Sequence, residues 1–228
     1  MPVVTLNQVS KLYGRFAALR EVSAEFEPGR LYAIFGENGA GKSTLLRVIA
    51  GLARPSSGTV RYGDTVTNGQ ERAAILRKLG YMAHAAMLYD ELTALENLRY
   101  FGALYGMTRS DDAKLRAAIA AVGLDAGLDR HVGEYSQGMR QRLSLARTIL
   151  HEPQLLLLDE PFSNLDANSS QEIGRLLASW RDAGRTILVV THQAAQVEPI
   201  ADASLWLERG AIARRTSAQS STPPGARA

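Results

Sequence analysis

A glycine-rich loop that follows a short apolar run constrains this 228-residue chain more than any other feature. The apolar run covers residues 31–35, and residues 36–44 follow it with the sequence Gly-Glu-Asn-Gly-Ala-Gly-Lys-Ser-Thr. The pattern G-x-x-x-x-G-K-[ST], between a strand and a helix with an apolar face, is typical of a loop that wraps the phosphates of a nucleoside triphosphate. Backbone N–H groups and the positive end of the helix dipole then face the phosphates. Residues 36–44 are called the phosphate-binding loop below.

The residue types in the phosphate-binding loop suit this task. Glycine tolerates the positive φ angles that turn backbone N–H groups toward a phosphate. Lys42 can reach the β- and γ-phosphates, and the hydroxyl of Ser43 is a suitable ligand for Mg²⁺. A glycine-rich turn that carries a lysine by chance would not need the flanking strand and helix. The loop residues that we expect to contact the nucleotide are Gly36, Asn38, Gly39, Gly41, Lys42, Ser43 and Thr44.

Two adjacent carboxylates follow a second apolar run. Residues 155–158 are four leucines, as expected of a central strand that is buried on both faces, and Asp159 and Glu160 come directly after them. Beside a phosphate-binding loop, an aspartate at such a strand end can hold Mg²⁺, and the next glutamate can polarise an attacking water. The alternative is a strand end that carries two solvated acids.

A third segment begins with Tyr-Ser-Gln-Gly-Met at residues 135–139, about 20 residues before the acidic pair. Ser136 is a good N-cap and Gly138 allows close approach, so this helix N-terminus could bind a phosphate that belongs to another subunit. A helix that merely starts with Ser-x-Gly is the alternative for this segment taken alone.

These segments, in this order, resemble the ATP-binding cassette (ABC) ATPases over residues 3 to about 212. The resemblance implies the α/β class and a P-loop NTPase ABC cassette, with a parallel core sheet, an N-terminal antiparallel β part and an inserted helical subdomain at about residues 85–150. We expect one ABC ATPase domain over residues 1–212 and a disordered tail over residues 213–228, which are rich in serine, proline, glycine and alanine.

The resemblance also implies a role for each site residue. Glu160 is the expected base toward water, His192 looks like the switch histidine at the γ-phosphate, and Lys42 completes the catalytic set. Tyr13 looks like the aromatic residue that stacks on adenine, although it could be an ordinary strand residue, and His192 could be a simple strand-end histidine. The expected cofactors are ATP and Mg²⁺. The residues expected at Mg²⁺ are Ser43, Asp159 and His84.

His84 departs from the family pattern, which places a glutamine after Gly-Tyr-Met-Ala at residues 80–83. With residues 92–98, 159–162 and 191–193, this histidine resembles the haem-exporter ATPase of bacterial cytochrome c maturation. The segment at residues 135–139 looks more like exporters of drugs, lipids or polysaccharides. Export is therefore expected, with haem and these other cargoes as alternatives.

The expected partners are an integral membrane transporter subunit and a second ATPase subunit in a head-to-tail dimer, at the cytoplasmic face of the inner membrane. The chain has no cysteine and no apolar stretch near 18 residues, so any pore would be another polypeptide. Three arginines, at positions 214, 215 and 227, account for the net charge of +3, which does not support a nucleic-acid groove. The alternatives are a soluble ABC-type ATPase that acts on DNA or ribosomes, and a small-molecule kinase.

Overall fold

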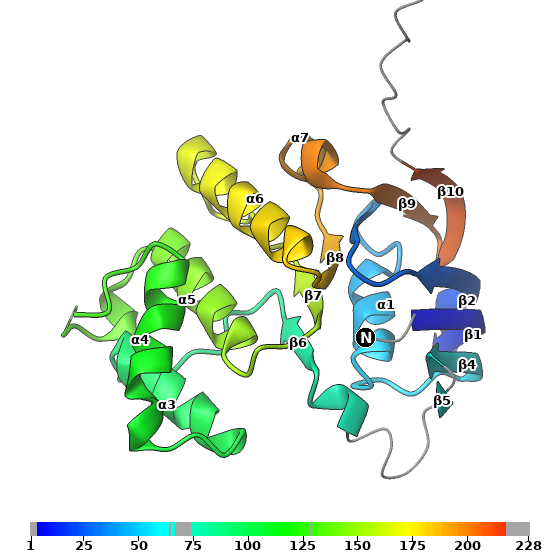
Figure 1. Ribbon diagram of the computed structural model, residues 1–228. Helices are drawn as coiled ribbons and strands as arrows, with labels where there is room; N and C mark the ends of the chain where they lie inside the picture. The colour runs from blue at the N-terminus through cyan, green and yellow to red at the C-terminus, as the bar shows by residue number, and fades with distance from the viewer. Residues whose placement is uncertain (1–3, 64, 67–73, 128, 218–228) are drawn as a thin grey trace, which may run out of the picture.

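The computed structural model describes residues 4–63, 65–66, 74–127 and 129–217. Two sheets pack beside a group of helices (Figure 1). The strands are β1 (Val4–Tyr13), β2 (Phe16–Phe26), β3 (Leu31–Gly36), β4 (Ser57–Tyr62), β5 (Thr65–Val66), β6 (Leu79–Met82), β7 (Leu155–Asp159), β8 (Thr186–Val190), β9 (Ala203–Glu208) and β10 (Ala211–Ser217). The helices are α1 (Lys42–Ile49), α3 (Ala94–Leu104), α4 (Asp112–Ala121), α5 (Gln137–Ile149), α6 (Ala167–Asp182) and α7 (Ala194–Val197), with short 3₁₀ helices at Arg109–Asp111, Val132–Glu134 and Glu198–Ile200.

The core sheet has the strand order β10-β9-β3-β8-β7-β6, and the pairs from β9 to β6 are parallel. Every residue of β7 and β8 is buried, as their continuous apolar sequences predict. Because β3, β8, β7 and β6 are consecutive neighbours, their carboxyl ends lie along one edge of the sheet. The last residues of these four strands and the segments directly after them contain the phosphate-binding loop, His192, the acidic pair and His84, so the strand order alone brings them together.

The second sheet is antiparallel, with the order β2-β1-β4-β5. Helix α1 lies between the two sheets, where Leu45, Leu46 and Ile49 are fully buried against one face of the core sheet. Alternate residues of β3 point to opposite faces of the core sheet. Tyr32 and Ile34 pack with the buried residues of α1, whereas residues 31, 33 and 35 pack on the helices at the other face. This packing fixes the phosphate-binding loop at the start of α1.

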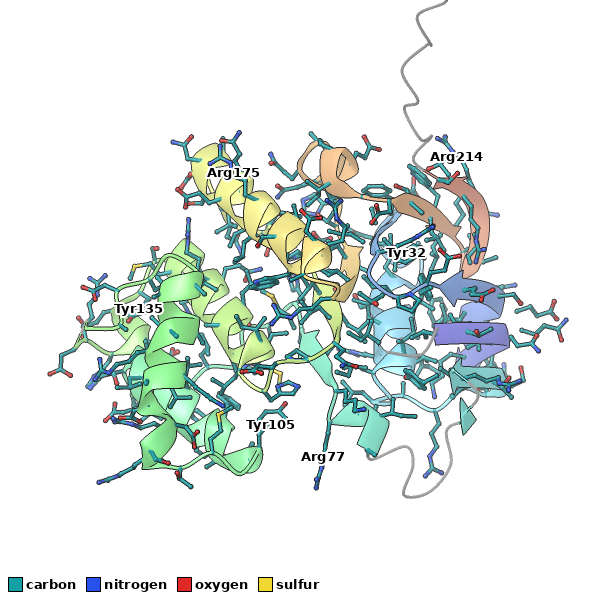
Figure 2. All side chains as sticks on the ribbon, viewed as in Figure 1. Tyr32, Arg77, Tyr105, Tyr135, Arg175 and Arg214 are labelled. Atoms are coloured by element: carbon teal, nitrogen blue, oxygen red, sulfur yellow. The ribbon has the colours of Figure 1, made fainter. Side chains whose placement is uncertain are left out.

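Helices α3, α4 and α5 gather on the far side of β6, in the region expected to be helical (Figure 1). The predicted capping box is confirmed: the Thr93 hydroxyl accepts from the backbone N–H of Glu96, and the Glu96 carboxylate accepts from that of Thr93. Figure 2 shows Tyr105 and Tyr135 on this side, whereas Arg214 lies on β10 at the opposite end. Within the described ranges, no helix is long and apolar enough to span a lipid bilayer.

The predicted tail boundary at residue 213 is wrong, because β10 continues to Ser217. This strand pairs with β9 in antiparallel register. Two of its arginines make further contacts: the Arg214 guanidinium lies 4.5 Å from the centre of the Trp206 ring, and Arg215 donates to the carbonyl of Ser23 at 2.9 Å. Polar and basic residues suit such an exposed edge strand, and for that reason they resembled a tail in the sequence. The rest of the expected tail, residues 218–228, lies outside the described residues.

Candidate functional site

The phosphate-binding loop requires glycine where it passes close to other backbone. Gly36 has φ of 148°, and a Cβ there would lie 2.3 Å from the carbonyl oxygen of Leu207. Gly41 has φ of 103°, and its Cβ would lie 2.3 Å from the carbonyl oxygen of Ala18. Helix α1 begins at the next residue, Lys42, so the loop presents the N-terminal end of an eight-residue helix.

Lys42 folds back over the loop. Its side-chain nitrogen donates to the carbonyl oxygens of Gly36 at 2.7 Å and Glu37 at 2.9 Å, and the residue is 8% exposed. The ammonium group is thereby held over the mouth of the loop, where a phosphate would meet it.

The phosphate-binding loop, the acidic pair and two histidines line one cavity of about 770 Å³. Every loop residue expected to contact the nucleotide is among its lining residues. The lining residues are Phe16, Ala18, Gly36, Glu37, Asn38, Gly39, Gly41, Lys42, Ser43, Thr44, His84, Asp159, Glu160, Val190 and His192. The structure therefore brings together groups from four strand ends that are up to about 150 residues apart in the sequence.

Asp159 lies at the bottom of this group and is 3% exposed. Burial raises the pKa of its carboxyl, whereas the hydrogen bond with Ser43 lowers it. The nearby Glu160 raises this pKa further, and His84 lowers it. A carboxylate beside a hydroxyl offers the hard oxygen ligands that Mg²⁺ prefers.

The donor set fits a magnesium ion that is shared with a phosphate ligand. No group of three or more His, Cys, Asp or Glu residues that could hold a metal exists in the described part of the chain. Mg²⁺ usually binds through one or two protein oxygens together with substrate phosphates and waters, which is what Ser43 and Asp159 leave room for. His84 lines the same cavity with an exposed ring, but imidazole nitrogen is a poorer ligand for Mg²⁺ than oxygen. The assignment of His84 to the metal stays a prediction.

Glu160 and His192 are in direct contact. The Glu160 carboxylate lies 3.0 Å from Nδ1 of His192 and accepts from its backbone N–H at 3.4 Å. Glu160 has a left-handed backbone with φ of 56°, and its N–H donates to the carbonyl of Val190 at 2.8 Å. The carboxylate is largely shielded, at 13% side-chain exposure, whereas the His192 side chain is 65% exposed. A carboxylate that reaches the cavity with a histidine beside it is a suitable proton acceptor for a water molecule.

Tyr13 lies at the end of β1, directly opposite Phe16 of β2. Phe16 lines the cavity, and Tyr13 is not among the lining residues. The Tyr13 ring is exposed, with the Lys11 ammonium 4.9 Å from its centre. Sequence reasoning therefore missed Phe16, and stacking of Tyr13 on adenine stays a prediction.

Ser136 and Gly138 lie apart from this cavity and are absent from its lining. Ser136 caps α5, because its hydroxyl accepts from the backbone N–H of Met139 at 3.2 Å. Ser136 itself is exposed, so the N-terminal end of α5 is open to solvent and does not line the cavity that holds the phosphate-binding loop.

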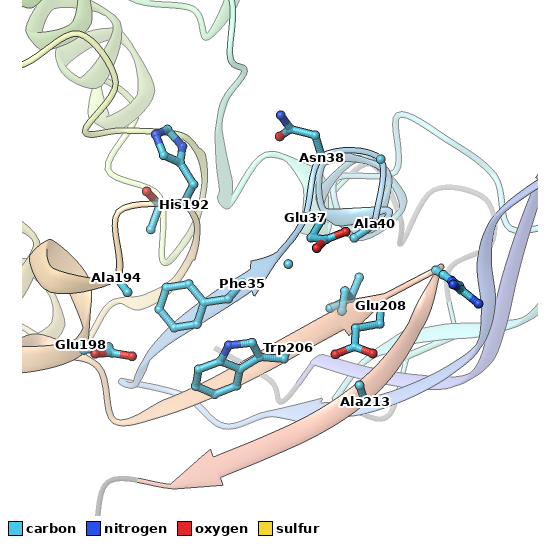
Figure 3. A pocket seen from close by; sticks show the side chains of 15 residues that line it. Phe35, Glu37, Asn38, Ala40, His192, Ala194, Glu198, Trp206, Glu208 and Ala213 are labelled. Atoms are coloured by element: carbon cyan, nitrogen blue, oxygen red, sulfur yellow. The ribbon is translucent and has the colours of Figure 1, made fainter.

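A second cavity of about 950 Å³ borders the other flank of the phosphate-binding loop. Figure 3 shows the rings of Phe35 and Trp206 side by side on the sheet, with the glutamates 37, 198 and 208 around them. This cavity is the larger of the two, but Lys42 and the acidic pair do not line it. The residues that we expect to bind the triphosphate therefore gather in the smaller cavity.

The site also contains one polar residue, Gln141, that its sequence context did not single out. Gln141 of α5 is 6% exposed and donates to the carbonyl oxygen of Glu160 at 2.7 Å. The only available signal was a glutamine five residues after Ser136, on the helix that precedes the acidic pair.

Comparison with known proteins agrees with this geometry. The ABC transporter family matches residues 19–163. The ABC transporter ATP-binding protein NatA of Bacillus subtilis is 37% identical over 207 residues, which are 89% of this chain and 83% of that protein. The ergothioneine transport ATP-binding protein EgtV of Helicobacter pylori is 35% identical, over 90% of this chain and 97% of that protein. The chain spans less of a longer relative, 58% of the sulfate/thiosulfate import ATP-binding protein CysA 2 of Rhizobium meliloti.

Solved structures agree as well. A dimeric ATP-binding cassette in a post-hydrolysis state, bound to ADP and Pi, matches with a TM-score of 0.86 at 27% identity, covering 94% of this chain and 98% of that chain. A nucleotide-free cassette from an ABC transporter matches with a TM-score of 0.85 and supports the fold. The chain therefore belongs to the ABC transporter family, as an ATP-binding cassette that hydrolyses ATP.

Proposed function

We propose that this ATPase drives a membrane exporter as one half of a head-to-tail pair, at the cytoplasmic face of the cell membrane. One observation carries the pairing: Lys42, Ser43, Asp159 and Glu160 line one cavity, whereas Ser136, at the N-terminal end of α5, is exposed and is not among the residues that line it. In a head-to-tail pair, the α5 end of each chain would cover the nucleotide held by the other. Two ATP molecules would then lie in the seam and hold the pair closed.

The proposed chemical step uses the residues of one cavity. Glu160 takes a proton from a water whose oxygen attacks the γ-phosphorus, and the bond from that phosphorus to the β–γ bridging oxygen breaks. Lys42 and the loop N–H groups hold the phosphates in line. Mg²⁺, held by Ser43 and Asp159, would supply charge neutralisation at the β- and γ-phosphates. Loss of the γ-phosphate removes contacts across the seam, so hydrolysis would reopen the pair.

A mixing experiment tests the pairing. Lys42→Ala removes the phosphate contact but keeps a normal α5 end, whereas Ser136→Arg places a bulky charge at the seam but keeps a normal loop. Each variant alone should have little ATPase activity. A mixed dimer contains one site built from the intact loop of one chain and the intact α5 end of the other, so mixing should restore activity.

The control for this experiment is a mixture of Lys42→Ala with Glu160→Gln. Here the only intact loop belongs to the chain that has lost the base, so mixing should restore nothing. No recovery in the Lys42→Ala and Ser136→Arg mixture, while each variant still folds and the latter still binds ATP, would contradict the cross-subunit role of Ser136.

An aromatic cluster on the helical side is our candidate contact for the membrane subunit. The rings of Tyr89, Tyr100 and Phe101 lie within 6.0 Å of one another, and Tyr89 and Tyr100 are each more than 40% exposed. Core packing of the helices is the competing role for Phe101, whose ring is only partly buried. Replacing both exposed tyrosines by serine should reduce co-purification with a hydrophobic membrane protein while leaving ATP binding unchanged.

Export is proposed on the basis of the sequence segments and of a relative named for Nod factor export, that of Rhizobium etli. Haem is the specific cargo that residues 80–84, 92–98 and 191–193 suggest. Deletion of the gene should then abolish periplasmic c-type cytochromes in a haem stain, and the Lys42→Ala variant should not complement. Normal cytochrome c in the deletion strain would instead favour a drug, lipid or polysaccharide as cargo.

A further inference from the structure

The proposed base Glu160 is held by its backbone in an unusual conformation. Its φ of 56° lies in the left-handed region, which is unfavourable for a residue with a Cβ. Such a conformation persists only when its surroundings hold it. The identity of the groups that hold it therefore decides where the carboxylate points.

Three hydrogen bonds hold this backbone. The N–H of Glu160 donates to the carbonyl of Val190 at 2.8 Å, and its carbonyl accepts from the backbone N–H of Ser163 at 3.1 Å. The third bond comes from outside these strands and turns: Nε2 of Gln141 donates to the same carbonyl at 2.7 Å. Gln141 also lies 3.4 Å from the hydroxyl of Ser163, and both side chains are nearly buried. A buried donor at this distance makes a well-formed bond that is costly to leave unmade.

Gln141 belongs to the helix whose N-terminal end is proposed to reach the other subunit. Ser136 caps that helix, and Gln141 lies a little more than one turn further on. The same end of α5 also packs on the loop after Glu160: a Cβ at Gly138 would meet Cδ2 of Leu165 at 3.3 Å and the carbonyl of Asn164 at 3.9 Å. A tilt or shift of the N-terminal part of α5 would therefore move Gln141 and act on the Glu160 carbonyl through its hydrogen bond.

We propose that Gln141 is a positioning residue. By fixing the Glu160 carbonyl it determines the position of the Glu160 carboxylate, and this position then depends on where α5 lies. Docking of α5 on a second chain would thereby adjust the base in its own chain, which links the two nucleotide sites of the pair. This inference rests on the proposed role of Glu160 as the base.

The test replaces the amide without changing the packing volume. Gln141→Met keeps an unbranched side chain of similar length and removes the N–H donor. We expect kcat for ATP hydrolysis to fall about 10- to 100-fold, because misplacement of a catalytic group by about 1 Å costs on that order. KM for ATP should change less than about threefold, since the phosphate-binding loop is untouched. Gln154→Met, at an exposed position before the opposite end of β7, is the matched control and should behave as wild type.

Two further measurements separate positioning from a structural role. In the Glu160→Gln background, adding Gln141→Met should not lower the residual hydrolysis further, because both changes act on one step. ATP-dependent dimerisation of that double variant should equal that of Glu160→Gln alone. If Gln141→Met does not fold, Gln141→Asn, which keeps an amide but is one methylene too short, takes its place in every measurement.

Unchanged kcat in the Gln141 variants would overturn the proposal. So would loss of dimerisation in the double variant, which would show that Gln141 only supports the shape of α5. If Gln141→Met lowered hydrolysis in the Glu160→Gln background by the same factor as in wild type, Gln141 would act on something other than Glu160. Near-normal hydrolysis by Glu160→Gln alone would contradict a different hypothesis. It would refute the role of Glu160 as the base, but it would not test the hydrogen bond from Gln141.

Discussion

Replacing Glu160 by glutamine should separate ATP binding from ATP hydrolysis. The Glu160 side chain is 13% exposed and lies 3.0 Å from His192. Because glutamine has the same shape, the substitution should change the free energy of unfolding very little. The partner histidine is 65% exposed, and ion pairs at such exposed positions contribute between about 0 and 1 kcal/mol. A general base contributes about 10²- to 10⁴-fold to a rate, which corresponds to about 3 to 5 kcal/mol of activation free energy. We therefore expect a large loss of kcat with almost no change of melting temperature.

Phosphate release and size-exclusion chromatography measure the two halves of this prediction. The variant should release phosphate at least about 100-fold more slowly than wild type and elute as an ATP-dependent dimer that persists for hours. Glu152→Gln is the matched control, because Glu152 is exposed and also left-handed, with φ of 54°, but lies before β7 and away from the cavity. Hydrolysis within a few-fold of wild type in Glu160→Gln would refute the assignment of the base.

Three other changes test the loop and the packing. Lys42→Ala should leave the melting temperature without ligand nearly unchanged and abolish its increase with ATP, as measured by thermal shift. Gly41→Ala should destabilise the fold by about 1 to 3 kcal/mol in urea unfolding, because its Cβ would lie 2.3 Å from the Ala18 carbonyl at φ of 103°. Burial lowers the pKa of His151, so unfolding should become easier as the pH falls below about 6.5, where the unfolded chain takes up the proton first. His151→Phe, which can keep the stack on Tyr105, should give a flatter dependence of the unfolding free energy on pH between 7.5 and 5.5; an equal slope would contradict this origin.

The sequence predicted the parts of the site that depend on local pattern and strand order. Lys42, Asp159 and His192 each follow a short apolar strand or its loop, and parallel strands place such residues at one edge. The sequence could not predict the Gln141 bond, because it depends on how a helix from one side of the sheet packs on a turn 19 residues later. The end of β10 was missed for a related reason: its polar residues are ordered by pairing with β9 and not by their own propensity.

Lys42 and His192, the two side chains expected at the γ-phosphate, are each already bonded to protein groups, and these bonds affect how the site would respond to a nucleotide. Lys42 donates to two loop carbonyls, and the Glu160 carboxylate accepts from His192. A triphosphate bound by the lysine and the histidine would replace these bonds, which already involve charged groups, with bonds to phosphate oxygens, so the net gain would be smaller than the new contacts alone suggest. If His192 turned to the nucleotide as proposed, the exchange would also release Glu160 from His192 and free its carboxylate for a water molecule. With Gln141 fixing the carbonyl of the same residue from α5, the carboxylate would become available to water when the nucleotide engages His192 and be aimed correctly when α5 is seated. On the proposed pairing, the readiness of the base would therefore depend on both chains and not on one site alone.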